Sequence, residues 1–485
     1  MTSRKYLFYC AASVALGGLL FGFDSGVISG CEQAIQAEFH LSPFWHGLVV
    51  AGALLGTVLG VFCASWPSDR WGRRPTLVLM ATLFLVSAVG CAFTVRDPAV
   101  GPHMLGWMRF IGGLAIGGVS VVVPLYLVEI APPGVRGRLV AMNQLNIESG
   151  LFVSYVSNFF VARWMMSGGF FRDLCTRLAD VFASGPMSVE SVEWRVMLGM
   201  ECIPVVLFAV LLATIPESPR YLVRAGRLEE ARSVLERIGF PEVEKTLGEI
   251  RESLAALLHS NTQTLKHSNN ADAALFQRKF RKPILLAFLV AFFSQVSGVN
   301  AINYYGPRIF DMVFGAGSQT ASLMGTMGVG LMHVVFCVAA FFIIDRFGRR
   351  VLIIGGSAVM AAMLLLTGYE LSLGPKACSP TLAVIGILGF TAAFAISSGA
   401  VIWVYISEVF PNSVRAKGQA LGSFTHWFMC MVVSWSFVAV AEKAGHWAFY
   451  FFAACMLAQL AWGVFGMPET KGGTIEDIER RLGLR

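Results

Sequence analysis

Long apolar segments follow one another along almost the whole chain of 485 residues. About twelve of them are long enough to cross a bilayer as a helix. Hydrophobic residues make up 56% of the sequence and charged residues 14%, a balance too apolar for a soluble protein of this length. The predicted spans are 6–31, 46–66, 75–95, 103–129, 138–161, 195–215, 282–312, 320–344, 351–372, 381–407, 416–440 and 446–467. The sequence therefore predicts an all-α membrane protein with twelve transmembrane helices.

Basic residues fall on alternate loops between these spans. Arg70, Arg73 and Arg74 follow the second span, and Arg136 and Arg138 follow the fourth. The loops after the eighth and tenth spans carry Arg346, Arg349, Arg350, Arg415 and Lys417. Because short cytoplasmic loops are rich in Lys and Arg, we expect these loops and both termini on the cytoplasmic side of an inner or plasma membrane. The loops also explain the net charge of +7 without a nucleic-acid surface.

The chain repeats itself. DRWGRR at 69–74 returns as DRFGRR at 345–350, and the pattern YxxExxPxxxR at 126–136 returns at 405–415. Parallel repeats of six spans are typical of the major facilitator fold, in which the substrate binds between the halves near the midplane.

Four parts follow from this repeat. The predicted parts are an N-terminal six-helix bundle at 1–216 with an external insertion near 162–194, a cytoplasmic helical linker at 217–281, a C-terminal six-helix bundle at 282–467 and a cytoplasmic tail at 468–485. Cys175 and Cys378 fall in predicted loops, and pairing between them is left open.

Asp24 is the only charged residue in the first apolar run. A carboxylate in hydrocarbon is expensive, so it should face a protein interior or a water-filled cavity. At about 1.5 Å per residue, Asp24 lies roughly 12 Å below the outer end of its span, and Arg109 and Glu201 lie roughly 9 Å below theirs. Asp24 is therefore either a proton or substrate site near mid-membrane or half of a structural ion pair with Arg109.

The sequence resembles the sugar porter family of the major facilitator superfamily over essentially its whole length, and most of all the bacterial proton-linked monosaccharide symporters. The matching stretches are GFDSGVISG (22–30), DRWGRR (69–74), PLYLVEIAPPGVRG (124–137), NQLNI (143–147), PESPRYL (216–222), QVSGVNAINYY (295–305), DRFGRR (345–350), WVYISEVFPNSVR (403–415) and PETKGGTIEDI (468–478). Together, in this order and on these spans, they are highly specific.

The resemblance implies a proton-coupled symporter of a hexose or pentose that works by alternating access. It uses the proton gradient as its energy source and needs no cofactor or metal. Its partners would be the sugar, protons and the lipid bilayer, with no nucleic acid, and one copy would suffice. Alternatives are a facilitative sugar or polyol uniporter and a non-transporting sugar sensor on the same fold. An enzyme is not expected, since no nucleophile–base motif, metal cluster or phosphate loop stands out.

The same resemblance assigns the site residues. The sugar contacts are the amides of Gln144, Gln295 and Asn300 and the aromatic walls Trp403 and Trp427. Amides and indoles match the hydroxyls and apolar C–H faces of a sugar. The proton-coupling residues are Asp24, Arg109 and Glu201. A cytoplasmic lock that closes the inside of the outward-facing state comprises Glu129, Arg136, Glu217, Arg220, Arg349, Arg350, Glu408, Arg415 and Glu469.

Several positions depart from the family pattern. Ser294 replaces the first of two adjacent glutamines, and Cys430 falls where an amide is common. His333 lies where the eighth span usually carries a sugar-binding Asn, and Glu148 is an unusual charge one turn beyond Gln144. We expect His333 to bind the sugar, with packing in the core as the alternative. These departures leave the identity of the sugar open.

Overall fold

The structure is a computed structural model. It describes residues 3–132, 134–183, 187–266, 275–315, 317–374, 377–411 and 414–471, together with Ile478, Arg480 and Leu482. The described residues form helices and connecting turns, with no strand among them. All ten cysteines are free, so Cys175 and Cys378 are not paired.

The helices of the first half are α1 (Ser3–Val27), η1 (Ile28–Gly30), α2 (Glu32–Glu38), α3 (Pro43–Cys63), α4 (Ser65–Trp71), α5 (Arg73–Ala92), α6 (Gly101–Ile130), α7 (Arg136–Ser167), α8 (Phe170–Ala183), α9 (Val189–Gly199) and α10 (Cys202–Thr214). The linker helices are α11 (Pro219–Arg224), α12 (Leu228–Ile238) and α13 (Val243–Lys266). The second half contains η2 (Arg278–Phe280), α15 (Arg281–Val296), α16 (Val299–Phe314), α17 (Gln319–Phe347), α18 (Arg349–Ser372), α19 (Pro380–Ile396), α20 (Ser398–Glu408) and α21 (Arg415–Phe465).

Every predicted span overlaps a helix or an adjoining pair of helices. Eleven helical segments of the described chain are long and apolar enough to cross a membrane, two of them within α21. The remaining predicted span corresponds to α7, whose 32 residues are long enough. Asn143, Gln144, Asn146 and Glu148 make part of α7 polar. The predicted all-α architecture with twelve spans is thus confirmed.

Glycines allow α1 and α7 to lie unusually close. A Cβ atom on Gly22 would lie 1.9 Å from the carbonyl oxygen of Ile147, and one on Gly150 would lie 2.0 Å from that of Leu19. Either substitution would force the two backbones apart. The glycines near Asp24 therefore allow a second helix to pack directly on α1.

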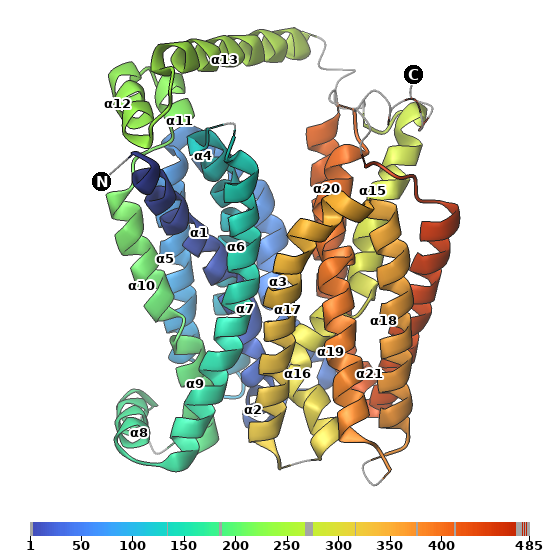
Figure 1. The fold of residues 1–485 in the computed structure, drawn as a ribbon. Helices are drawn as coiled ribbons and strands as arrows, with labels where there is room; N and C mark the ends of the chain where they lie inside the picture. The colour runs from blue at the N-terminus through green and yellow to red at the C-terminus, as the bar shows by residue number, and fades with distance from the viewer. Residues whose placement is uncertain are drawn as a thin grey trace.

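The two halves stand side by side, with α11–α13 at one end of the molecule and α2 and α8 at the other (Figure 1). We call these the linker end and the α8 end. The apolar core is arranged differently at the two ends. One buried cluster joins residues of both halves, whereas a second contains only residues between Leu7 and Leu247 and a third only residues between Leu275 and Leu482. The limits predicted for the four parts remain a prediction.

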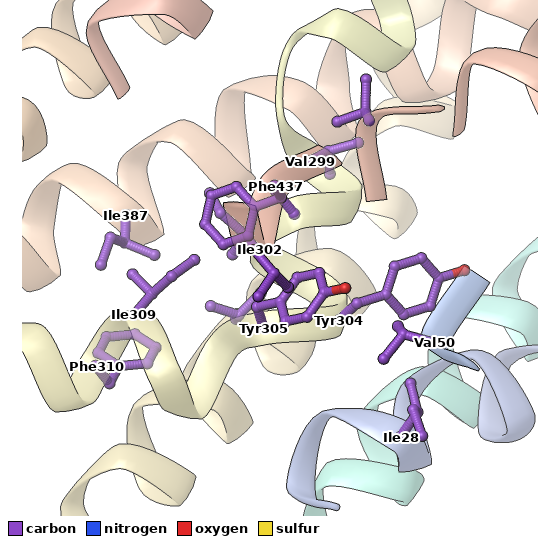
Figure 2. Packing of buried hydrophobic residues seen from close by; sticks show 14 of the residues in the cluster. Ile28, Val50, Val299, Ile302, Tyr304, Tyr305, Ile309, Phe310, Ile387 and Phe437 are labelled. Atoms are coloured by element: carbon purple, nitrogen blue, oxygen red, sulfur yellow. The ribbon is translucent and has the colours of Figure 1, made fainter. Parts of the chain in front are cut away.

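The shared cluster closes the α8 end. Figure 2 shows Tyr304 of α16 beside Val50 of α3 and near Ile28 of η1, all of them buried. Polar contacts between the halves reinforce it: Arg308 of α16 pairs with Glu32 of α2 through two bonds of 2.9 and 2.6 Å. Further contacts between the halves join Gln33 to Asp311, Gln319 to Glu193 and Trp435 to the carbonyl of Phe44. The halves are therefore held together at this end.

At the linker end, Glu217 caps α5 from a distant part of the chain. Its carboxylate accepts hydrogen bonds from the backbone N–H groups of Arg73 and Arg74, which would otherwise lack helical partners. The Arg73 guanidinium in turn donates two bonds to Glu129, at 2.9 and 2.8 Å. Gly72 has φ +108°, and a Cβ there would lie 2.3 Å from the Glu217 carboxylate, so this position requires glycine.

The second half repeats this arrangement. Glu469 accepts bonds from the backbone N–H groups of Arg349 and Arg350 at the start of α18, and Arg349 also binds Glu408 at 3.0 Å. Gly348 has φ +92°, and its Cβ would lie 2.7 Å from Glu469. The repeat seen in the sequence is therefore a repeat of a helix cap built from an arginine and two carboxylates.

The residues proposed as a cytoplasmic lock contact their own half here. Arg349 and Glu408 belong to the second half, as Arg73 and Glu129 belong to the first. Arg415 donates to the carbonyl of Phe410, also in its own half, and Arg350 to the carbonyls of Gly463 and Val464. Arg220 forms no ion pair with a described side chain, and the side chain of Arg136 lies outside the described residues.

The two capping carboxylates differ in their titration. Burial raises the pKa of Glu217, and its backbone hydrogen bonds only partly oppose that effect. Burial also acts on Glu469, but four backbone N–H groups outweigh it and the pKa of this carboxyl falls below its usual value. Glu469 therefore stabilises the fold at pH above its ordinary pKa and loses this contribution as the pH falls through its folded pKa. Glu217 contributes in the opposite sense and loses its contribution as the pH rises through its folded pKa.

We predict that Glu469→Gln lowers the thermal midpoint at pH 7.5 more than Glu217→Gln does. Each kcal/mol lost should lower the midpoint by roughly 2–4 °C in a unit the size of one half. The difference in thermal midpoint between the two variants should narrow as the pH falls below the ordinary glutamate pKa, because the contribution of Glu469 is lost in that direction. Thermal unfolding in detergent from pH 4 to pH 8 measures both effects. Equal losses at every pH would contradict the difference between the two caps.

Candidate functional site

Asp24 and Arg109 form a buried ion pair within the first half. The Arg109 guanidinium donates to Asp24 Oδ1 and, at 3.3 Å, to the backbone carbonyl of Asp24. Both side chains are at most 2% exposed. The Gly112 backbone of α6 comes close to the same carboxylate, since a Cβ there would lie 3.2 Å from Asp24 Oδ2. Helices α1 and α6 thus meet around one carboxylate.

Glu201 completes this group. It lies at the junction of α9 and α10 and is 2% exposed. It is close enough to Asp24 and Arg109 to interact electrostatically with both. The structure therefore brings together the three residues that were predicted from the sequence to lie at a similar depth in the membrane. One polar atom of each, namely Asp24 Oδ2, Arg109 Nε and Glu201 Oε1, has no hydrogen-bond partner among the described residues.

This arrangement can bind a proton. The group contains two carboxylates and one guanidinium, and the guanidinium pairs with Asp24. It therefore carries one negative charge in excess when both carboxylates are ionised. A buried excess charge is unfavourable, and one added proton would neutralise it. The group is therefore an ion pair in which Asp24 Oδ2 has no hydrogen-bond partner among the described residues, with Glu201 as a second acid beside it.

A second group of side chains gathers where α15 ends and α16 begins. The Asn300 amide donates to Gln295 Oε1 at 2.5 Å, and Gln295 Nε2 lies 2.9 Å from Nδ1 of His426. The His426 ring is 4.8 Å from the Trp403 ring and 5.1 Å from the Trp427 ring, measured between centroids. Four residues predicted to bind the sugar, Gln295, Asn300, Trp403 and Trp427, are thus collected around one histidine.

A break in the helix makes this possible. Gly298 has φ +88°, and a Cβ there would lie 2.3 Å from the Phe452 ring. The chain therefore changes direction between Gln295 and Asn300, which lets their amides meet. Broken helices at membrane depth occur where the backbone lines a site or is covered by protein.

His426 was missed in the sequence. Its signal was a polar residue next to Trp427 inside an apolar span, the same kind of signal that drew attention to His333. The resemblance directed attention to the tryptophans, while the packing of three rings was visible only in the structure.

A third group links α7 to the second half. Gln144 Nε2 donates to Glu148 Oε1 at 2.9 Å, and Glu148 Oε2 lies 3.4 Å from Nδ1 of His333. The other ring nitrogen of His333 lies 3.2 Å from Oδ1 of Asn303 on α16. Tyr155 of α7 donates to the backbone carbonyl of Asn303 at 2.8 Å. His333 is therefore a polar bridge between the halves, with Gln144 at one end of the chain of contacts.

The second and third groups remain separate in the described contacts. No hydrogen bond among the described residues joins Gln144 to Gln295 or Asn300, and Phe21 of α1 packs on Trp427 from the first half, with ring centroids 5.5 Å apart. Within the described part of the chain, no group of three His, Cys, Asp or Glu residues is placed to hold a metal ion.

Comparison with known proteins gives a consistent result. The family model described as sugar (and other) transporter matches residues 10–482. The arabinose-proton symporter of Bacillus subtilis is 36% identical over 99% of this chain and 95% of its own length. The D-xylose-proton symporter of Escherichia coli is 34% identical over 98% and 96%.

A solved structure agrees with these relatives. The inward open conformation of the xylose transporter XylE from E. coli superposes with a TM-score of 0.81 at 31% identity, covering 98% of this chain and all of that one. Family model, relatives and structure each cover nearly the whole chain. The protein is therefore a multi-pass membrane protein of the sugar transporter family, within the major facilitator superfamily.

Proposed function

We propose that the chain is a proton-coupled monosaccharide symporter that works by alternating access. The observation that carries the proposal is the buried group of Asp24, Arg109 and Glu201, an ionisable site enclosed in one helical bundle. A facilitative carrier has no need to bury three ionisable groups together, since each is expensive to remove from water. The relatives named as arabinose-proton and D-xylose-proton symporters support the same function.

In this proposal Asp24 carries the proton. When Asp24 is ionised, Arg109 holds it, as in the structure. Protonation removes the charge that Arg109 pairs with, and the guanidinium is then free to turn to Glu201. Because Asp24 lies on α1 and Arg109 on α6, breaking this pair changes the contact between these two helices.

The sugar would bind between the halves. Gln295, Asn300 and His426 offer donors and acceptors beside the aromatic faces of Trp403 and Trp427. Gln144 and His333 would contribute from the α7 and α17 side. This set matches a small polyhydroxy ligand with apolar C–H faces.

We propose that the linker end is cytoplasmic and that the structure represents an inward-facing state. The arginine-rich loops lie at the linker end, which fits the preference of basic loops for the cytoplasm. The shared core at the α8 end and the separate clusters at the linker end fit the same state. The lock residues would then engage across the halves only when the linker end closes, which explains why they contact their own half here.

The direct test is uptake of labelled pentoses, hexoses and polyols into proteoliposomes, with and without a pH gradient. A symporter accumulates its sugar above equilibrium only when the gradient is present. Uptake that reaches equilibrium regardless of the gradient would favour a uniporter, and binding without uptake would favour a sensor.

Replacing Asp24 should separate coupling from binding. Asp24→Asn keeps the size of the side chain and removes its titration, so we expect gradient-driven accumulation to vanish while sugar exchange partly survives. Asp311→Asn is the matched control, because Asp311 contacts Gln33 and Ser322 at the α8 end and lies outside the proton group. Undiminished uphill uptake by Asp24→Asn would exclude Asp24 as the proton site.

Truncating the aromatic wall should weaken sugar binding. We expect Trp403→Ala to reduce sugar affinity about tenfold or more, since removing an aromatic anchor from a binding site commonly costs about 2 kcal/mol or more. Trp107→Ala serves as the control, because Trp107 of α6 is 64% exposed and packs on Phe110, away from the proposed site. Equilibrium binding in detergent measures both, and equal affinities in the two variants would count against a sugar-binding role for Trp403.

A further inference from the structure

Glu148 has no part in the proton group or in the predicted sugar contacts, yet it touches two residues of the proposed sugar site. Its carboxylate binds Gln144 on one oxygen and lies 3.4 Å from His333 on the other. We propose that Glu148 is a specificity-determining residue whose carboxylate accepts the hydrogen of one sugar hydroxyl. This inference rests on the proposed function and adds to it the group that selects among sugars.

The charged residues near Glu148 leave its carboxylate available to a ligand. Among the described residues, its one ion-pair partner is His333, and no arginine or lysine pairs with it. The titratable groups near it are His333 and Cys337 on α17 and Tyr155 on α7. The Tyr155 hydroxyl already donates to the carbonyl of Asn303. None of these groups holds the carboxylate as the Arg109 guanidinium holds Asp24.

The carboxylate also has unused acceptor capacity. Two carboxylate oxygens offer about four lone-pair positions, and the structure accounts for one to Gln144 and one to His333. The side chain of Glu148 is 19% exposed, whereas that of His333 is 4% exposed. A hydroxyl that approaches Glu148 therefore meets an open acceptor next to the amide of Gln144.

This chemistry differs from that of the amides in the site. Gln144, Gln295 and Asn300 can donate as well as accept, whereas an ionised carboxylate only accepts. Glu148 therefore requires a donor at the facing position of the sugar. Hydrogen bonds to a charged group are also stronger than those between neutral groups, so the wrong substituent at that position would be penalised.

His333 positions this carboxylate. Its ring is buried between Glu148 and Asn303, and it packs at 6.4 Å on the Phe394 ring of α19. Contacts at both nitrogens and with Phe394 fix the ring, and the ring in turn holds the Glu148 oxygen that does not bind Gln144. Because α7 belongs to the first half and α16 and α17 to the second, the acceptor forms only where the halves meet.

The test uses D-glucose and D-xylose with their single-position deoxyfluoro analogues as competitors of uptake. Fluorine replaces a hydroxyl at similar size but has no hydrogen to donate. In the parent protein we expect one analogue to lose affinity roughly 10- to 100-fold, as for a lost bond to a charged acceptor. In Glu148→Gln the affinity for the natural sugar should fall, and the affinity for that same analogue should no longer be lower than the affinities for the other analogues. Gradient-driven accumulation should persist, since Asp24 is intact.

Glu193→Gln is the matched control. Glu193 is a carboxylate that likewise accepts a hydrogen bond from a glutamine amide, that of Gln319, but it is buried and lies at the α8 end. This variant should keep the parent's ranking of analogues. If Glu148→Gln fails to fold, as judged by thermal unfolding, Glu148→Asp withdraws the carboxylate by one methylene and should likewise lose the discrimination.

The outcomes separate this inference from the proposed function. If the parent protein accumulates a sugar but Glu148→Gln or Glu148→Asp keeps its ranking and affinities, the role of Glu148 is overturned and the symporter remains. If Glu148→Gln loses accumulation while its ranking is unchanged, Glu148 belongs to proton coupling and the inference is overturned. If the parent protein accumulates no sugar, the proposed function itself fails.

Discussion

The structure depends on the ion pair that Asp24 and Arg109 form among apolar helices. Asp24 and Arg109 are each almost fully removed from solvent, and neither would be tolerated there alone. Their contact therefore joins α1 to α6, while glycines let α7 pack on another face of α1. With Glu201 beside them, Asp24 and Arg109 also form a group whose net charge one proton changes. The same constraint thus supports both the architecture and the proposed coupling.

The two ends of the molecule use different means to hold their helices. At the linker end, each half caps its own helix with a carboxylate and an arginine, which keeps that half rigid without binding it to the other. At the α8 end, apolar packing and pairs such as Glu32 with Arg308 cross between the halves. A molecule built in this way can move its halves relative to each other while each keeps its internal contacts. That property is what alternating access requires.

Several positions in the spans depart from the pattern of the family, among them His333 and Glu148. His333 lies where the family usually carries an Asn, Glu148 is an unusual charge one turn beyond Gln144, and in the structure the two contact each other. His426 adds a second imidazole between two tryptophans. The two histidines therefore contact different parts of the proposed site: His333 is linked to Gln144 through Glu148, and His426 contacts Gln295.

The sequence by itself determined the helical class, the spans, the repeat and the group around Asp24. These features follow from local rules: apolar length sets a span, and an isolated charge in it demands a partner at the same depth. Only the tertiary structure decided that Glu217 and Glu469 cap helices, that His426 joins the tryptophans, and that Glu148 meets His333. Each of these contacts links segments far apart in the chain, or depends on a break such as that at Gly298, so no local pattern encodes it. Which end is closed was likewise decided by packing between the halves, because one sequence must accommodate both states.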